Sequence, residues 1–263
     1  MTQPEIIYED TQLIVCYKPA GIATQTKKLG QKDMVSILSN HVAQEENKQP
    51  FIGVVHRLDQ PVEGVMVFAK TKQAAAKLSA QVKDHSFGKK YYAKVQLPEG
   101  KTFEEATGRE TAGTLRDWMQ FNPKENKSCV VEPPQGRNTQ EEIGHPADKR
   151  QSKMKKKDTS AAQNKVQEAV LDYQVIRQEE GTALLDITLH TGRHHQIRVQ
   201  LSHLGTPICG DHKYGNAASG IPALCSYHID FVHPISGKEM TYEISPGNFE
   251  AGAVTVRRGA SEQ

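Results

Sequence analysis

Residues 54–69 read VVHRLDQPVEGVMVFA, and this stretch decides how the rest of the chain is interpreted. Val54-Val55 ends one apolar run. Residues 65–69 form a second run, too short and too continuously apolar for a helix with exposed faces. We therefore expect two buried strands joined by the loop HRLDQPVEG. A loop held between rigid strands presents its polar side chains outward, which is how a nucleophile or a base is held.

Asp59 is the carboxylate of this loop, two residues after Arg57 and three after His56. A simpler interpretation is that Asp59 stabilises its own turn by accepting hydrogen bonds from backbone amides. The loop by itself does not decide between these two roles.

Outward from the loop, strands outnumber helices. Apolar alternation and turn residues predict strands within 5–17, 89–97, 169–193 and 225–244. Helical spacing of apolar residues predicts helices at 32–43, 72–86 and 194–205. Most neighbouring strands are expected to pair antiparallel, and no internal repeat is present.

Composition excludes several classes of protein. In 263 residues, 33 Lys and Arg against 31 Asp and Glu give 33 − 31 = +2, so any nucleic-acid site must be a local basic patch. The four cysteines are far apart, which argues against a disulfide framework or a zinc site. The first twenty residues do not resemble a signal peptide, and no run is long and apolar enough to span a membrane. We expect a cytoplasmic protein without a membrane partner.

The stretch from about 133 to 165 has almost no large apolar residue, so burial cannot offset its ordering entropy. We predict a disordered insertion. Between Asp148 and Lys165 it holds seven Lys or Arg against two Asp, net 7 − 2 = +5. This segment is either an electrostatic tether to RNA or a solvated loop, which the sequence leaves open.

Two further segments concentrate functional side chains. TGRHHQIR at 191–198 gathers Arg193, His194, His195, Gln196 and Arg198 at the start of a predicted helix, a density that suits phosphates or a carboxylate. The alternative is a solvated helix start. Metal binding ranks last, because adjacent histidines on a helix point about 100° apart and no carboxylate lies in the segment.

KKYYAKV at 89–95 alternates basic and aromatic residues on a strand. Tyr91 and Tyr92 must face opposite ways, so only one of them can share a site with Asp59. Ordinary cross-strand packing of a tyrosine is the alternative.

The ordered set of motifs resembles the RluA family of pseudouridine synthases. The motifs are KPAG at 18–21, HRLD at 56–59, KKYYAKV at 89–95, GRHHQIR at 192–198 and G-x-P-I-x-G-D-x-x-Y-G from Gly205 to Gly215. The resemblance runs from about Ile6 to Pro246. Several motifs in one order form a specific signal, unlike a single glycine fingerprint.

The resemblance implies an α+β fold with a mixed, mostly antiparallel bent sheet, flanking helices and a cleft across its middle. It places the family's catalytic aspartate on Asp59, its active-site tyrosine on Tyr91 and the arginine that pairs with the aspartate on Arg198. Contacts to RNA are expected from Lys18, His56, Arg57, Arg193, His195 and Gln196. The implied activity isomerises uridine in ribosomal or transfer RNA and needs no cofactor and no metal.

The implied chemistry is consistent with these residue types. A nearby guanidinium keeps a carboxylate ionised when a flipped base displaces water. An aromatic ring can stack on the extruded base for about 1–3 kcal/mol, which helps offset unstacking.

The sequence departs from the family pattern in two places. Val62-Glu63 stands where the family usually has Thr-Ser, and Cys225-Ser226 stands where it commonly has His-Ala. We also expect a single catalytic domain over 1–263, without a preceding RNA-binding domain, acting as a monomer. Two other activities remain open: a non-catalytic RNA-binding relative, and a hydrolase that uses Asp59.

Overall fold

The computed structural model describes residues 4–28, 30–46, 50–134, 165–245 and 255–259. Its strands are β1 Glu5–Glu9, β2 Leu13–Lys18, β3 Gly53–Val54, β4 Glu63–Ala69, β5 Gly88–Gln96, β6 Ala112–Asn122, β7 Lys127–Val131, β8 Gln167–Glu179, β9 Thr182–Leu189, β10 Leu224–Val232, β11 Glu239–Ser245 and β12 Thr255–Gly259. Its helices are α1 Met34–Glu46, α2 Lys72–Lys83, α3 Phe103–Thr107 and α4 Gln196–His203. Every predicted element is present, whereas α3, β6, β7 and β12 were not predicted. The predicted insertion at 133–165 lies outside the described residues except at its ends.

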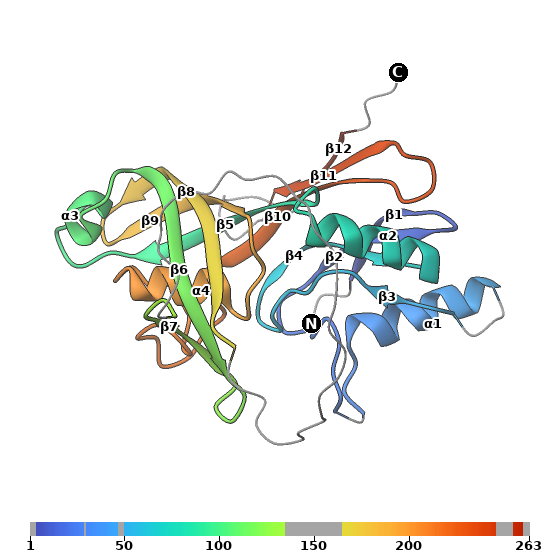
Figure 1. Cartoon of the computed structure of the whole chain (residues 1–263), viewed down its shortest axis with the longest axis horizontal. Coiled ribbons are helices and arrows are strands. Elements are labelled where there is room, and N and C mark those ends of the chain that lie inside the picture. The colour runs from blue at the N-terminus through green and yellow to red at the C-terminus, as the bar shows by residue number, and fades with distance from the viewer. Residues whose placement is uncertain (1–3, 29, 47–49, 135–164, 246–254, 260–263) are drawn as a thin grey trace, which may run out of the picture.

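The strands join one 12-stranded sheet in the order β1-β2-β4-β10-β5-β9-β8-β6-β7, with β3 beside β4 and with β11 and β12 continuing from β10. Among the described strand pairs, β4 and β10 alone run parallel. Figure 1 shows the sheet curving between its two halves. The predicted α+β class with a mixed, mostly antiparallel sheet is confirmed.

Helices α1 and α4 pack on one face of the sheet, and helix α2 packs on the other. On the half formed by β2 and β4, α1 packs through Met34 and Leu38 in the same apolar cluster as Ile14 and Met66. Helix α2 packs through Leu78 in the cluster of the opposite face. Helix α4 joins the α1 cluster from the other half of the sheet. The loop that carries Asp59 lies between α1 and α4 (Figure 1).

Gly64 allows β10 to run close beside β4 directly after this loop. Its φ is +143°, and a Cβ at this position would lie 2.4 Å from the carbonyl oxygen of Ser226. Only glycine combines this conformation with so close a backbone approach. The two halves of the sheet therefore join next to Asp59.

Candidate active site

The Asp59 loop is held by the segment that follows β2. Within the loop, the Val62 amide donates to the Asp59 carbonyl at 3.0 Å. From the segment after β2, the Gly21 amide donates to the Gln60 carbonyl at 2.8 Å. The Thr24 hydroxyl donates to the Leu58 carbonyl at 2.9 Å and accepts from the Leu58 amide at 3.2 Å. These bonds fix the backbone on both sides of Asp59, so its carboxylate is presented by a rigid loop.

Lys18 is part of this support, and its burial argues against the predicted contact with RNA. The side chain is fully buried, and its ammonium donates to the carbonyls of Pro19, Ile22 and Gln60 at 3.0, 2.7 and 3.2 Å. Burial lowers the pKa of Lys18 to about 8. No surface of Lys18 is left for a phosphate, and it ties the end of β2 to the loop.

His56 is also buried, which argues against its predicted contact with RNA as well. Its Nε2 accepts a hydrogen bond from the Val67 amide at 3.1 Å, and its ring packs 5.2 Å from the ring of Phe87. Burial, with a smaller effect from Lys89, lowers the pKa of His56 to about 3. A neutral, buried histidine anchors the start of the loop to β4.

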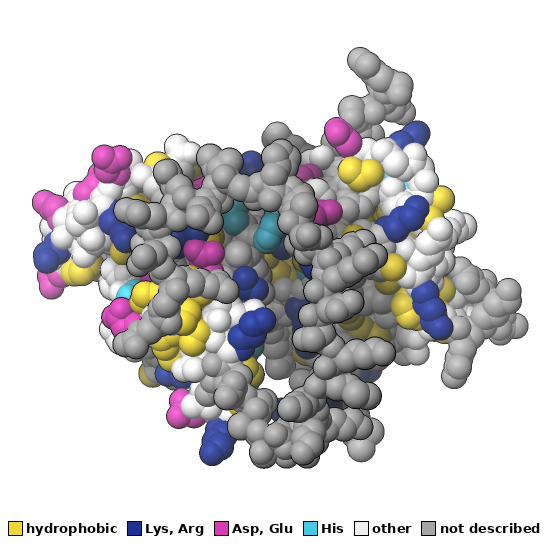
Figure 2. All heavy atoms as spheres, in the orientation of Figure 1, with side chains coloured by type: hydrophobic (Ala, Val, Ile, Leu, Met, Phe, Trp, Pro, Cys, Tyr) yellow, Lys and Arg dark blue, Asp and Glu magenta, His cyan; other side chains and the backbone are white. Residues whose placement is uncertain are grey.

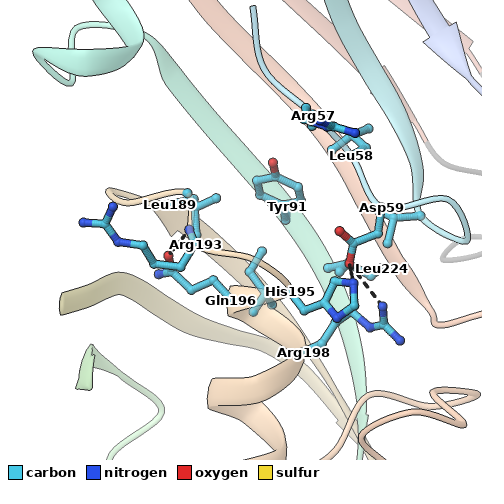
Figure 3. Close-up of a pocket in the computed structure, with 13 residues that line it drawn as sticks. Arg57, Leu58, Asp59, Tyr91, Leu189, Arg193, His195, Gln196, Arg198 and Leu224 are labelled. Atoms are coloured by element: carbon cyan, nitrogen blue, oxygen red, sulfur yellow. Dashed lines mark hydrogen bonds and ion pairs between the residues drawn. The ribbon is translucent and has the colours of Figure 1, made fainter. Parts of the chain in front are cut away.

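The remaining predicted site residues line one cavity: Arg57, Asp59, Tyr91, Arg193, His195, Gln196 and Arg198 (Figure 3). The loop supplies two of them, β5 supplies Tyr91, and the others come from the start of α4 and the turn before it. Figure 2 shows Lys or Arg and His side chains near the middle of the face that it views.

Arg198 joins Asp59 to a second carboxylate. Its Nη1 donates to Asp59 Oδ2 at 3.1 Å, and its Nε and Nη2 donate to the two oxygens of Asp211 at 2.7 and 2.8 Å. Among the described residues, Asp59 Oδ1 has no hydrogen-bond partner. The predicted pairing of residues 59 and 198 is present, and one carboxylate oxygen faces the cavity.

Charge balance keeps Arg198 ionised despite its burial. Burial opposes its charge, but the bonds to Asp211 and the attraction of Asp59 outweigh it and raise the pKa of Arg198. Burial likewise opposes the charge of Asp211, and the bonds from Arg198 outweigh it and lower the pKa of Asp211. A buried arginine shared by two carboxylates is thus a fixed cation beside Asp59.

Tyr91 and Tyr92 face opposite sides of the sheet, as the alternation of β5 requires. Tyr91 lines the cavity between Leu58 and Gln196, whereas Tyr92 stacks on Tyr227 at a ring distance of 3.9 Å in the other apolar cluster. Burial raises the pKa of Tyr91, so its hydroxyl stays protonated.

The other predicted RNA contacts differ in their exposure. Arg57 is exposed at the rim of the cavity, and Arg193 extends away from Asp59 while its Nε donates to the Glu168 carbonyl at 2.7 Å (Figure 3). Gln196 is buried, and it accepts from the Arg193 amide at 3.0 Å and donates to the Val170 carbonyl at 3.1 Å. Gln196 therefore positions the turn, and its burial argues against a direct contact with RNA.

The two histidines do not lie on a helix, which corrects one expectation. Helix α4 begins at Gln196, and His195 precedes it in the left-handed conformation with φ 55°. The rings of His194 and His195 therefore stack at 3.7 Å instead of pointing apart. His195 Nε2 lies 3.6 Å from Asp59 Oδ2.

Three residues around this site were not predicted. Asp211 holds Arg198, the Tyr214 hydroxyl lies 2.8 Å from His195 Nδ1, and the Ser128 amide of β7 donates to that hydroxyl at 3.0 Å. Asp211 and Tyr214 belong to the motif G-D-x-x-Y-G, which could have drawn attention to them. Nothing in the sequence around Ser128 indicates that it lies near the site.

No helix in the described part of the chain is long and apolar enough to cross a membrane.

Comparisons with known proteins identify the family to which the chain belongs. The family model of RNA pseudouridylate synthases matches residues 12–203. A ribosomal large subunit pseudouridine synthase D from Pseudomonas aeruginosa is 30% identical over 259 residues, covering 91% of this chain and 67% of the relative. The enzyme of the same name from Zymomonas mobilis is 28% identical over 255 residues, with coverages of 91% and 68%. An uncharacterized RNA pseudouridine synthase from Bacillus subtilis is 30% identical over 243 residues, with coverages of 91% and 67%.

Solved structures share the fold. Human RNA pseudouridylate synthase domain containing 4 superposes with a TM-score of 0.66 at 21% identity, covering 94% of this chain and 90% of that chain. Human RNA pseudouridylate synthase domain containing 1 gives a TM-score of 0.62 at 16% identity, covering 99% and 91%. The match of the family model to most of the chain, on the fold that carries the Asp59 site, shows that this chain belongs to the RluA family of RNA pseudouridine synthases, which are isomerases.

Proposed function

We propose that the protein converts uridine to pseudouridine in RNA and that the carboxylate of Asp59 is the nucleophile. The observation that carries this proposal is the pairing of Asp59 with Arg198 in the cavity. The guanidinium holds Oδ2, and Oδ1 is left facing the space where a ribose would bind.

The reaction breaks the bond between N1 of uracil and C1′ of ribose and forms a bond between C5 and C1′. In this mechanism Asp59 Oδ1 attacks C1′ and uracil departs with the electrons of the glycosidic bond. The uracil rotates, C5 displaces the carboxylate, and the C5 proton is lost to water while N1 regains a proton. No step requires a change of oxidation state.

Tyr91 is suited to stack on the extruded uracil. Its ring lies on the cavity wall beside Leu58, and its raised pKa makes its phenol a hydrogen-bond donor in the resting site. Arg57 and Arg193, at the rim, are the described residues best placed to contact RNA phosphates.

The proposed substrate is ribosomal RNA of the large subunit. This rests on the printed names of two relatives at 28% and 30% identity. Transfer RNA is the alternative that the assay below must include. The monomeric state, the cytoplasmic location and the single domain over 1–263 stay predictions.

The test uses RNA labelled with tritium at C5 of uridine, because only bond formation at C5 releases that label. We expect release by the wild-type protein and a loss of about 10³-fold or more in Asp59→Asn. Asp172→Asn is the matched control, since it removes an exposed carboxylate that bonds Thr114 and His190 outside the cavity.

Three outcomes would contradict the proposal. Release that persists in Asp59→Asn would exclude the carboxylate as nucleophile. Free uracil in place of pseudouridine would identify a hydrolase, and binding of RNA without release by the wild-type protein would identify a non-catalytic relative.

A further inference from the structure

A chain of hydrogen bonds leads from β7 to Asp59. The Ser128 amide donates to the Tyr214 hydroxyl at 3.0 Å, and that hydroxyl lies 2.8 Å from His195 Nδ1. On the other side of the same ring, His195 Nε2 lies 3.6 Å from Asp59 Oδ2. Figure 3 shows the His195 ring beside the Arg198 guanidinium, with both side chains directed at Asp59.

The bonding around Tyr214 favours one tautomer of His195. A phenol has one proton to donate, and the Tyr214 oxygen already accepts from the Ser128 amide. Among the described residues, His195 Nδ1 is the one acceptor within reach of that proton. If Tyr214 donates to Nδ1, the proton of a neutral imidazole must be on Nε2.

The position of Asp59 favours the same tautomer independently. An Nε2–H group faces the Asp59 carboxylate with the favourable sign of charge, whereas the other tautomer would place a nitrogen lone pair against the carboxylate. Burial, together with His194, Arg198 and Lys213, lowers the pKa of His195 to about 3. The ring is therefore neutral at neutral pH.

The backbone holds His195 in place at a cost. A left-handed conformation in a residue with a Cβ costs about 1–2 kcal/mol, and His195 adopts it with φ 55°. Although His195 occupies the N-cap position of α4, its side chain makes no capping bond. Strain without a capping bond indicates that the position is used for function.

We propose that His195 is a positioning residue for Asp59, with its Nε2–H directed at Oδ2 by the hydroxyl of Tyr214. This inference rests on the proposed function of Asp59. Two donors, from Arg198 and His195, then share Oδ2 and orient the carboxylate so that Oδ1 points to C1′. The separation of 3.6 Å shortens to a hydrogen bond when substrate displaces water from the cavity.

The tautomer is measured first, by nitrogen-15 NMR of the imidazole rings in the whole protein without RNA. We expect His195 to show a protonated Nε2 and an unprotonated Nδ1. In Tyr214→Phe, which keeps the ring that packs on Arg198, both nitrogens should shift toward a mixture of tautomers. A protonated Nδ1 in the wild-type protein would overturn the inference.

Kinetics then test the effect on catalysis. We expect Tyr214→Phe and His195→Leu to lower kcat about 10- to 100-fold with little change in KM, and His195→Gln, whose amide nitrogen can replace Nε2, to recover part of the loss. Tyr227→Phe is the matched control, because its hydroxyl donates to Asp186 at 3.0 Å outside the cavity. An unchanged kcat in His195→Leu would refute the positioning role.

The two measurements separate the two proposals. Measuring the tautomer requires no turnover, so this part of the inference is tested whether or not the protein is active. If the wild-type protein shows the expected tautomer but releases no tritium, the proposed function fails, and the positioning role in catalysis fails with it. If tritium release depends on Asp59 but His195→Leu keeps full kcat, only the further inference fails.

Discussion

Arg198 holds two carboxylates at once, and lysine cannot replace it. The guanidinium uses two nitrogens on Asp211 and a third on Asp59, in a fork that an ammonium does not reproduce. Because the group is almost fully buried, the lost bonds are not replaced by water.

We therefore predict that Arg198→Lys lowers the free energy of unfolding by about 1–3 kcal/mol and lowers kcat more than it raises KM. Denaturant unfolding and steady-state tritium release measure the two effects. Arg116→Lys is the control, because Arg116 pairs with Glu168 on the exposed surface, where ion pairs contribute little. Equal losses in the two variants would show that the arginine fork in the site has no special role.

Because the pKa of His56 differs between the folded and unfolded states, the free energy of unfolding should depend on pH. Its pKa is near 3 in the folded protein and near 6.5 in the unfolded chain. Below pH 6.5 the unfolded chain therefore binds a proton that the folded protein does not. Above pH 6.5, His56 is neutral in both states and causes no loss of stability. As the pH falls from 6.5 toward 3, the free energy of unfolding decreases by about 1.4 kcal/mol per pH unit.

Between pH 7.5 and 5.0 we expect His56→Gln to lose about 2 kcal/mol less stability than the wild-type protein. Glutamine keeps an acceptor for the Val67 amide but does not titrate. His195 titrates in the same direction and is present in both proteins, so the difference between their unfolding curves isolates His56. Parallel curves over this range would contradict the prediction.

At the scale of elements, the support of the Asp59 loop comes from a segment more than thirty residues earlier in the chain. Thr24 bonds the backbone of Leu58 in both directions, so one hydroxyl satisfies a buried amide and a buried carbonyl. A valine has nearly the shape of threonine but would leave both groups without a partner.

We predict that Thr24→Val destabilises the protein by about 1–3 kcal/mol and lowers kcat, because a small displacement of Asp59 is enough to slow the reaction. Thermal unfolding and tritium release would measure both effects. Thr114→Val removes a hydroxyl bonded to Asp172 at an exposed position and serves as the control. Full activity in Thr24→Val would show that this bond does not position Asp59.

The same elements show what could be predicted from sequence. The strands around Asp59 were predictable, because residues 65–69 are an uninterrupted apolar run and β5 alternates strictly. Strand β6 was missed because Leu115 and Met119 are its only buried residues, so its alternation is weak. Helix α3 has the capping box Thr102 to Glu105, a signal that could have identified it.

The burial of Lys18 and His56 could not be predicted from the sequence. The family resemblance implied that both polar residues contact RNA. Their burial depends on β4 and on the 18–24 segment packing around the loop, which local sequence does not specify. The pairing of Asp59 with Arg198, 139 residues apart, was expected from the family resemblance and not from spacing.

At the scale of the whole molecule, the end of β7 and the start of β8 lie close together in the sheet. Val131 of β7 and Glu168 of β8 both pair with Trp118, from opposite sides of β6. Two strand spacings separate them, about 10 Å. A linker of about six residues has a mean span of about 13 Å and can close this distance.

We therefore predict that replacing residues 135–164 with a six-residue Gly-Ser linker leaves the Tm within a few degrees and kcat unchanged. Strands β6, β7 and β8 keep all their partners in such a variant. Calorimetry and tritium release on a short RNA would measure this. A large loss of Tm would show that the segment contributes to the folded core.

The same variant decides between the two interpretations of the basic segment. Replacing residues 135–164 removes seven Lys or Arg and four Asp or Glu, net 7 − 4 = +3. If this segment were a tether, its removal would make the dependence of log Kd on log salt shallower by several units. We expect no change, because loops lengthen at small entropic cost without needing a function and Arg57 and Arg193 already line the cavity. A second variant with the Lys and Arg of 149–157 changed to Gln separates charge from length. A shallower slope in both variants would contradict this expectation and identify the segment as an RNA tether.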